Sequence, residues 1–218
     1  MEGIIVYGAG GHAKAVIDVI EQSGRYSIIG LLDSYKPAGT VVYGYPVLGN
    51  NDWLASHYKE VYGGIVGIGD NSLRASIAGA IKAVHPSFSF ISAIHPTASL
   101  ARGASIGAGS VLMAGAFVGS DTLLGEHCVL YAGASIDHDC SIGSFVSFAP
   151  KAATGGGVAI GDYSAVAIGA SIIHGRTIGE HTVVGAGSTV ISDLPSHTVA
   201  YGTPARPARV RASGERYL

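Results

Sequence analysis

A hydrophobic residue recurs at every sixth position along the second half of the chain. The series runs from Leu100 to Val190 without an insertion, and fifteen of its sixteen positions are aliphatic or phenylalanine, with Thr154 as the exception. A small residue usually stands four positions later, and glycine often follows directly. A period of six matches neither the 3.6 of an α-helix nor the 3.5 of a coiled coil. The series is Leu100, Ile106, Leu112, Val118, Leu124, Leu130, Ile136, Ile142, Phe148, Thr154, Ile160, Val166, Ile172, Ile178, Val184 and Val190.

This period predicts a parallel β-helix built from hexapeptides. Each hexad would supply a short strand and a corner, and three hexads would close one triangular coil whose corner aliphatic residues fill the interior. Glycine beside the core residue suits a tight corner where a Cβ would crowd the bend. Residues one full coil apart should then stack about 4.8 Å apart along the axis. A sandwich of short strands would instead show variable strand lengths and turns.

The first 84 residues alternate between apolar strands and helices. Residues 4–7, 28–32 and 62–68 predict strands, and residues 13–21 follow helical spacing closed by Gly24. Two further helices are expected, a short one ending at His57 with Asn51 or Asp52 as its cap, and one ending before Pro86. This alternation predicts a parallel sheet flanked by helices. We therefore expect an α/β domain over residues 1–84 and a β-helical domain over residues 85–218.

The six-residue period stops after Val190, where prolines break regular structure. Residues 201–205 predict an ordered loop that leads into a basic tail. The tail is either a solvated terminus or a contact to a phosphate-bearing cofactor. Its arginines are Arg206, Arg209, Arg211 and Arg216.

Composition narrows the classes of protein. Charged residues make up 13% of the 218 residues, and 33 glycines accompany a hydrophobic share of 48%. No segment stays apolar for the roughly 18 residues that a spanning helix needs. A formal charge of −2 and the lack of a basic cluster argue against nucleic acid or anionic lipid as the main partner. With no export signal and only Cys128 and Cys140, which the period places on different faces as small core residues, we expect a soluble cytoplasmic protein.

A glycine-rich turn lies between the first predicted strand and helix. Gly8-Ala9-Gly10-Gly11-His12-Ala13 fits the pattern G-x-G-x-x-A, and Asp33 follows the next strand. Glycine lets the backbone approach a phosphate, the helix N-terminus directs N–H groups at the anion, and Asp33 could accept from a ribose or a base. The turn predicts a nucleotide-binding site but does not specify NAD. A redox enzyme would need a second half of the sheet to hold the nicotinamide, and 84 residues leave little room for it. A turn that serves only the strand-to-helix geometry is the alternative.

A histidine flanked by carboxylates stands out in the repeats, within Ile136-Asp137-His138-Asp139-Cys140. His138 lies two places after a core residue and should face outward. A carboxylate bonded to one ring nitrogen fixes the tautomer and supports the imidazolium that forms when the other nitrogen takes a proton. Adjacent strand residues point alternately and cannot converge on an ion, so we expect no metal site. From the residues alone, His138 is either a general base or a surface histidine.

The predicted stacking adds neighbours to His138. Gly156 falls one coil above it and His174 two coils above. A bare backbone beside a base could donate an N–H to a developing oxyanion. His174 could line the same groove or be a solvated corner histidine.

Together these features resemble the hexapeptide-repeat sugar acyltransferases that carry a small Rossmann-like N-terminal domain. The resemblance extends over nearly the whole chain and is strongest to the nucleotide-linked 4-amino-sugar N-acetyltransferases and the sialic acid O-acetyltransferases. It rests on Gly8-Ala9-Gly10-Gly11-His12-Ala13-Lys14, Leu32-Asp33, Gly44-Tyr45-Pro46-Val47-Leu48-Gly49, Gly67-Ile68-Gly69-Asp70-Asn71, His95-Pro96, Ile136-Asp137-His138-Asp139-Cys140 and Gly202-Thr203-Pro204-Ala205.

The resemblance implies a left-handed coil and a homotrimer, with His138 as general base and Asp139 as its partner. It also implies that the N-terminal domain holds the nucleotide of the sugar donor, with Gly10, His12 and Asp33 nearest the phosphates and the base.

For the co-substrate, the resemblance implies acetyl-CoA in the groove between adjacent coils. Gly156, Ile168 and Ala186 match positions whose backbone meets the cofactor. Ser147 stands where many members carry a second histidine near the thioester, and its hydroxyl could still donate a hydrogen bond there.

We therefore expect acetyl-CoA-dependent N-acetylation of the 4-amino group of a nucleotide-linked amino-deoxy sugar, with UDP as the expected nucleotide. O-acetylation of sialic acid or another sugar hydroxyl would use the same base and cofactor. A non-catalytic nucleotide- or NAD-binding module on a structural β-helix is an alternative from a different class.

Overall fold

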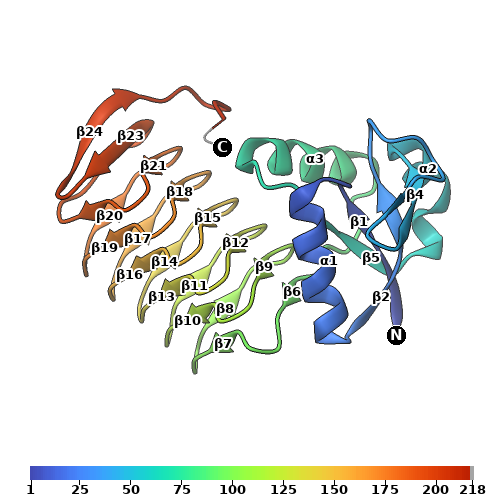
Figure 1. The fold of residues 1–218 in the computed structure, drawn as a ribbon, viewed down its shortest axis with the longest axis horizontal. Helices are drawn as coiled ribbons and strands as arrows, with labels where there is room; N and C mark the ends of the chain where they lie inside the picture. The colour runs from blue at the N-terminus through green and yellow to red at the C-terminus, as the bar shows by residue number, and fades with distance from the viewer. Residues whose placement is uncertain (217–218) are drawn as a thin grey trace.

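The computed structural model describes residues 1–216 and shows an α/β part beside a long stack of coils (Figure 1). The α/β part is a five-stranded sheet in the order β3-β4-β2-β1-β5, parallel except for the β3–β4 pair. The alternating pattern of the sequence is thereby confirmed. Its elements are β1 (Glu2–Tyr7), α1 (Gly11–Ser23), β2 (Tyr26–Leu32), β3 (Val41–Val42), β4 (Tyr45–Gly49), α2 (Asn51–His57), the 3-10 helix η1 (Tyr58–Glu60), β5 (Gly63–Val66) and α3 (Asn71–Val84).

Local signals set the ends of these helices. Gly24 ends α1 in the left-handed conformation (φ 61°), as its position in the sequence predicted. The cap of α2 is Asn50, whose side chain accepts from the Asp52 N–H, so the expectation of Asn51 or Asp52 was wrong by one residue. The cap must have extended backbone, and in the structure the chain turns helical directly after Asn50.

The second part is a left-handed parallel β-helix of two-residue strands. Three sheets form its faces, in the orders β22-β19-β16-β13-β10-β7, β20-β17-β14-β11-β8 and β24-β23-β21-β18-β15-β12-β9-β6. Partners lie one coil apart, as in Val118 with Ile136, which is the predicted spacing. The strands are β6 (Ala93–Ile94), β7 (Ser99–Leu100), β8 (Ser105–Ile106), β9 (Val111–Leu112), β10 (Phe117–Val118), β11 (Leu123–Leu124), β12 (Val129–Leu130), β13 (Ser135–Ile136), β14 (Ser141–Ile142), β15 (Ser147–Phe148), β16 (Ala153–Thr154), β17 (Ala159–Ile160), β18 (Ala165–Val166), β19 (Ser171–Ile172), β20 (Thr177–Ile178), β21 (Val183–Val184), β22 (Thr189–Val190), β23 (Thr198–Gly202) and β24 (Ala205–Val210).

The every-sixth-residue series forms the core of the coils, with two corrections. Each member is the second residue of its strand rather than a corner residue. Leu100 is 42% exposed and Ile106 is only partly buried, because they belong to the first coil and no coil covers them from below. Thr154, the exception in the series, is buried like its neighbours.

The glycines beside the core residues are needed for packing between coils. A Cβ at Gly107 or Gly125 would collide with the backbone of the next coil. The left-handed corner position comes two residues later and is often occupied by other residue types, among them His127, Asp139 and Phe145. The sequence located these glycines correctly, but the crowding comes from the neighbouring coil rather than from the bend itself.

The C-terminal segment forms a hairpin where an ordered loop and a basic tail, either solvated or in contact with a cofactor, were expected. β23 pairs in parallel with β21 and returns through β24, so the segment caps the last coil. Arg211 is 1% exposed and donates to the carbonyl oxygens of Tyr163, His181 and Glu215. Arg211 therefore fastens the chain end to the coils, a role that neither interpretation of the tail included.

Both cysteines are free and buried on different faces of the coil, as the spacing predicted. Burial raises the pKa of the Cys128 thiol to about 12, which keeps it protonated and unreactive. Within residues 1–216, no helix has the length and apolar character to cross a membrane.

Candidate active site

The glycine-rich turn opens into a polar pocket at the N-terminus of α1. The pocket has a volume of about 420 Å³, and Gly10, Gly11, Lys14, Lys36 and Tyr43 are among the residues that line it. Two ammonium groups beside the free N–H groups of a helix start make this pocket suitable for an anion such as a diphosphate.

The glycines of this turn differ in whether the fold requires them. Gly8 has a φ of 116° and its Cβ would strike the Gly67 carbonyl, so only glycine fits there. Gly10 has an ordinary φ of −92°, and a Cβ on Gly10 or Gly11 would meet nothing within 4 Å. The missing side chains leave space on the pocket side, where a ligand can approach the backbone.

Asp33 lies at the end of β2, but its carboxylate is engaged by the protein itself. One oxygen accepts from the Ala9 N–H at 2.9 Å, and the other accepts from the N–H groups of Tyr35 and Lys36. Asp33 therefore holds the glycine turn and the Lys36 loop together. This is a supporting position beside the pocket, and the ligand contact expected from the sequence stays a prediction.

His12 sits at the start of α1 and faces the β-helix. Its Nδ1 lies 3.2 Å from the Tyr131 hydroxyl, and the two ring centroids are 5.5 Å apart. Burial, followed by the charge of Arg74, lowers the pKa of His12 to about 4. The imidazole is therefore neutral at pH 7 and joins the glycine-rich turn to the coil that carries Tyr131.

His138 projects from the corner between β13 and β14, with a side-chain exposure of 59%. Its Nδ1 lies 2.7 Å from Asp139 Oδ2, and its backbone N–H donates to Asp137 Oδ1 at 2.8 Å. The hydrogen bond to Asp139, with the charge of Asp137 second, raises the pKa of His138. The pairing with Asp139 leaves Nε2 as the nitrogen that can exchange a proton with a substrate.

The neighbours predicted above His138 are in place. A Cβ on Gly156 would collide with Cε1 and Nε2 of the His138 ring, so a side chain there would displace the imidazole. His174 follows one coil further and is exposed. Period-six stacking located both correctly.

An apolar groove of about 330 Å³ runs along the outer face of the sheet that contains β12, β15, β18 and β21. Three of the expected cofactor residues, Ser147, Ile168 and Ala186, line this groove together, and Gly156 does not. The other lining residues are Tyr131, Ala149, Pro150, Ala165, Val166, Ala167 and Val183.

The Ser147 hydroxyl is held from the α/β side. It donates to Asn71 Oδ1 at 2.6 Å, and Arg74 donates both to that Asn71 oxygen and to Ser147 Oγ. Because the hydroxyl hydrogen points at Asn71, it is not directed at a thioester, contrary to the expectation from the sequence. Arg74 is fully buried and also donates to the carbonyl oxygens of His127 and Phe145. Sequence reasoning missed Asn71 and Arg74, because helical spacing gives no sign that polar residues of α3 face another domain.

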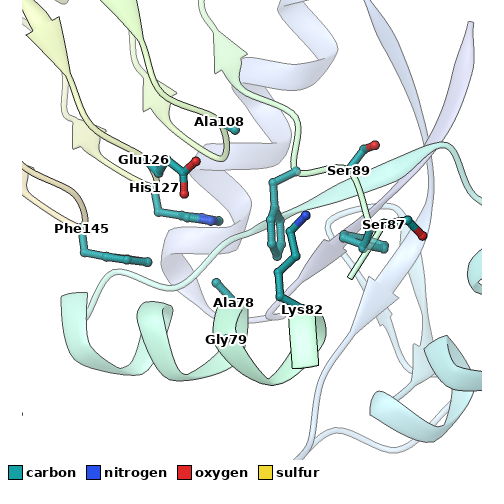
Figure 2. A pocket seen from close by; sticks show the side chains of 11 residues that line it. Ala78, Gly79, Lys82, Ser87, Ser89, Ala108, Glu126, His127 and Phe145 are labelled. Carbon is teal, nitrogen blue, oxygen red and sulfur yellow. The ribbon is translucent and has the colours of Figure 1, made fainter. Parts of the chain in front are cut away.

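A further cavity, of about 450 Å³ and separate from the polar pocket and the apolar groove, lies at the junction of the two parts (Figure 2). Lys82 of α3 and the corner residues Glu126, His127 and Phe145 face it, and the His127 and Phe145 rings stack 5.0 Å apart. It is larger than the groove but contains none of the expected site residues. The His127 and Phe145 rings belong to a row of stacked rings along this corner of the coil. We expect these rings to stabilise the junction of the two parts.

Within one chain, the expected site residues fall into three places. The glycine-rich turn and the apolar groove meet at the His12–Tyr131 contact. His138, Asp139 and Gly156 lie on another corner of the coil, after β13 and β16, and line neither pocket. No group of three or more metal-binding side chains occurs in the described part of the chain.

Comparisons with known proteins identify a family model for the N-terminal part and solved structures for nearly the whole chain. Residues 3–81 match the family model of the PglD N-terminal domain. A histidine-to-alanine mutant of GDP-perosamine N-acetyl transferase from Caulobacter crescentus, in complex with CoA and GDP-perosamine, superposes with a TM-score of 0.90 at 33% identity, over 96% of this chain and 98% of that one. A comparison with curated protein sequences finds no match.

Two further solved structures agree over nearly their full lengths. The acetyltransferase domain of PglB from Neisseria gonorrhoeae, in complex with acetyl coenzyme A, has a TM-score of 0.87 at 32% identity, over 95% of this chain and 99% of that one. WeeI from Acinetobacter baumannii has a TM-score of 0.84 at 26% identity, over 94% and 99%. The chain therefore belongs to the hexapeptide-repeat sugar N-acetyltransferases with a PglD-type N-terminal domain.

Proposed function

We propose that this enzyme transfers the acetyl group of acetyl-CoA to the 4-amino group of a nucleotide-linked amino-deoxy sugar, with His138 as the general base. The observation that carries the proposal is the His138–Asp139 pair, an exposed and oriented imidazole beside the bare backbone of Gly156. The similarity to the Caulobacter enzyme, which was crystallised with CoA and GDP-perosamine, supports the substrate class.

The nucleotide part of the donor sugar would bind at the glycine turn. The diphosphate would meet the N–H groups at Gly10 and Gly11 and the ammonium groups of Lys14 and Lys36. Asp33 would hold the loop of Lys36 in position. The sugar would then extend toward His12, where the turn meets the β-helix.

Acetyl-CoA would lie in the apolar groove. Ile168 and Ala186 would carry the backbone contacts to its arm, and the small side chains Ala165 and Ala167 leave room for it. This placement supports the roles expected for Ile168 and Ala186, and it makes Ser147 part of the groove wall.

The chemical step follows from these positions. The neutral amine nitrogen attacks the thioester carbonyl carbon, and Nε2 of His138 takes the proton that the amine loses. The oxyanion of the tetrahedral intermediate would accept from the Gly156 N–H. Collapse of the intermediate breaks the C–S bond, and the CoA sulfur leaves as the thiol after taking a proton from the imidazolium. Asp139 keeps the ring in the tautomer that these transfers need.

The proposal requires a second copy of the chain, because His138 and the groove lie on different parts of one coil. In a homotrimer, His138 of one subunit would face the groove of the next. The test is complementation: a His138→Ala chain is mixed with an Ala186→Trp chain, each inactive alone. Refolding them together should restore part of the activity, whereas a refolded mixture as inactive as each variant alone would contradict a shared site.

The substrate is tested by CoA thiol release with a panel of 4-amino-4,6-dideoxy sugars carrying UDP, GDP or dTDP. We expect release with at least one of them, with UDP as our first expectation, and a product heavier by one acetyl group on nitrogen. Release only with sialic acid or a sugar lacking the amine would instead establish O-acetylation. Thermal stabilisation by NAD but not by acetyl-CoA, with no thiol release, would favour a non-catalytic nucleotide-binding module.

A further inference from the structure

Tyr131 stands where the two candidate binding regions meet. It follows β12, lines the apolar groove, and places its hydroxyl 3.2 Å from Nδ1 of His12. It also packs against the hydrophobic cluster that joins α1 to the coils. The Tyr131 ring therefore separates the groove from the nucleotide turn.

The groups that Tyr131 meets directly, His12 on one side and the groove wall on the other, are uncharged. Burial and the charge of Arg74 keep His12 neutral, and its Nε2 is buried without a hydrogen-bond partner among the described residues. The groove that Tyr131 faces is lined by apolar or small side chains and carries no charged residue. An apolar part of a ligand, rather than a phosphate, suits this end of the groove.

The order of the coils gives the groove a direction. Val129 pairs with Ser147, Ser147 with Ala165, and Ala165 with Val183, so the groove climbs from the coil of Tyr131 toward the far end of the stack (Figure 1). The nucleotide turn reaches only the lower end, at Tyr131. Because the acyl carbon must meet the sugar, the acyl end of the thioester belongs at Tyr131 and the rest of CoA belongs toward Ala186.

We propose that Tyr131 is a specificity-determining residue that limits the length of the transferred acyl chain. Its ring ends the groove just beyond the acyl carbon, so acetyl fits and longer chains meet the ring. This inference rests on the proposed function, because it takes the direction of the thioester from the position of the sugar. Replacing the ring by a methyl group would extend the groove toward His12.

The test compares acetyl-, propionyl- and butyryl-CoA for the parent, Tyr131→Ala and Tyr131→Phe. Each methylene accommodated in an apolar site is worth about a fourfold factor, so Tyr131→Ala should raise the butyryl-to-acetyl ratio of kcat/KM by roughly 10-fold or more. Tyr131→Phe keeps the ring volume and removes the bond to His12, so its ratio should stay within about twofold of the parent's. Tyr131→Val serves as a second small variant should the alanine variant fold poorly.

The inference fails if a folded Tyr131→Ala or Tyr131→Val enzyme keeps the parental chain-length ratio. It also fails if Tyr131→Phe changes the ratio as much as the small variants do, since the hydroxyl would then set the preference. Calorimetric binding of the stable thioethers ethyl-CoA and butyl-CoA gives a second readout that needs no turnover. Parent protein that transfers no acyl group to any amino sugar refutes the proposed function, while unchanged thioether selectivity in the small variants refutes the role of Tyr131.

Discussion

The corner that carries His138 and the turn that carries His12 use the same side chain in opposite surroundings. His138 is exposed, and the hydrogen bond that its ring donates to the Asp139 carboxylate raises its pKa. His12 lies in the first turn of α1 against Tyr131, and burial lowers its pKa to about 4. One imidazole is thus prepared to accept a proton, and the other stays neutral and serves as a contact between two pockets. The difference shows that the carboxylate and the degree of burial, rather than the residue type, assign the roles.

Among the changes that test this comparison, removing the imidazole of His138 should have the largest effect, which is a loss of turnover. His138→Ala is expected to lower kcat by about 100-fold or more, because the amine then loses its proton to water alone. Acetyl-CoA binding measured by calorimetry should stay near the parental value. His174→Ala, which removes an exposed histidine two coils away, is the control and should keep parental turnover. Parental turnover in His138→Ala would refute the assignment of the base.

Buried histidines should make the fold sensitive to acid. Burial, with Arg74 and Lys82 adding to it, lowers the pKa of His127 to about 4. The unfolded chain takes up this proton near pH 6.5 and the folded chain only near pH 4, so the stability from this residue is present above pH 6.5 and is lost as the pH falls. Between pH 7 and pH 5 the loss should be about 2 kcal/mol.

His127→Phe tests this acid effect while retaining the ring. Phe145 already occupies the same left-handed corner position one coil above, so the stack can be kept. Urea unfolding at pH 7 and pH 5 should show a smaller loss of stability for the variant than for the parent. An equal loss in both proteins would mean that other groups, such as His12, account for the whole acid response.

Two glycines of the same turn, Gly8 and Gly10, should separate an effect on ligand binding from an effect on folding. Gly10→Ala places a methyl group in open space, so the melting temperature should hold, while KM for the nucleotide sugar rises about 10-fold through loss of a charge-assisted contact. Gly8→Ala forces a left-handed residue against the Gly67 carbonyl and should cost about 1–3 kcal/mol of stability. If Gly10→Ala instead destabilises the fold without a change in KM, the turn serves only strand-to-helix geometry.

The smallest expected effect is a displacement of the pH profile. Asp139→Asn replaces the charged acceptor of the hydrogen bond that contributes most to the raised pKa of His138 by a neutral amide oxygen. Activity requires the neutral imidazole, so the acidic limb of kcat/KM should move to lower pH in this variant. An acidic limb that does not move would assign that limb to another group.

Much of the fold was accessible from the sequence because the β-helix repeats one local rule. Each core position follows the last by six residues, and stacking then places Gly156 above His138 without further information. The alternation of strands and helices over residues 1–84 gave the parallel sheet in the same way. The C-terminal hairpin was not predicted because its sequence has no repeating spacing, and its strands form only by pairing with β21.

The sequence by itself determined the coil, the glycine-rich turn and the His138–Asp139 pair, because each depends on spacing or on adjacent residues. Only the tertiary structure decided which residues of the two parts meet. Arg74 reaches His127, Phe145 and Ser147 across the junction, and His12 reaches Tyr131, over separations that no local pattern encodes. These contacts form because α1 and α3 must bury faces that the small sheet alone cannot cover, and the coils supply the missing surface.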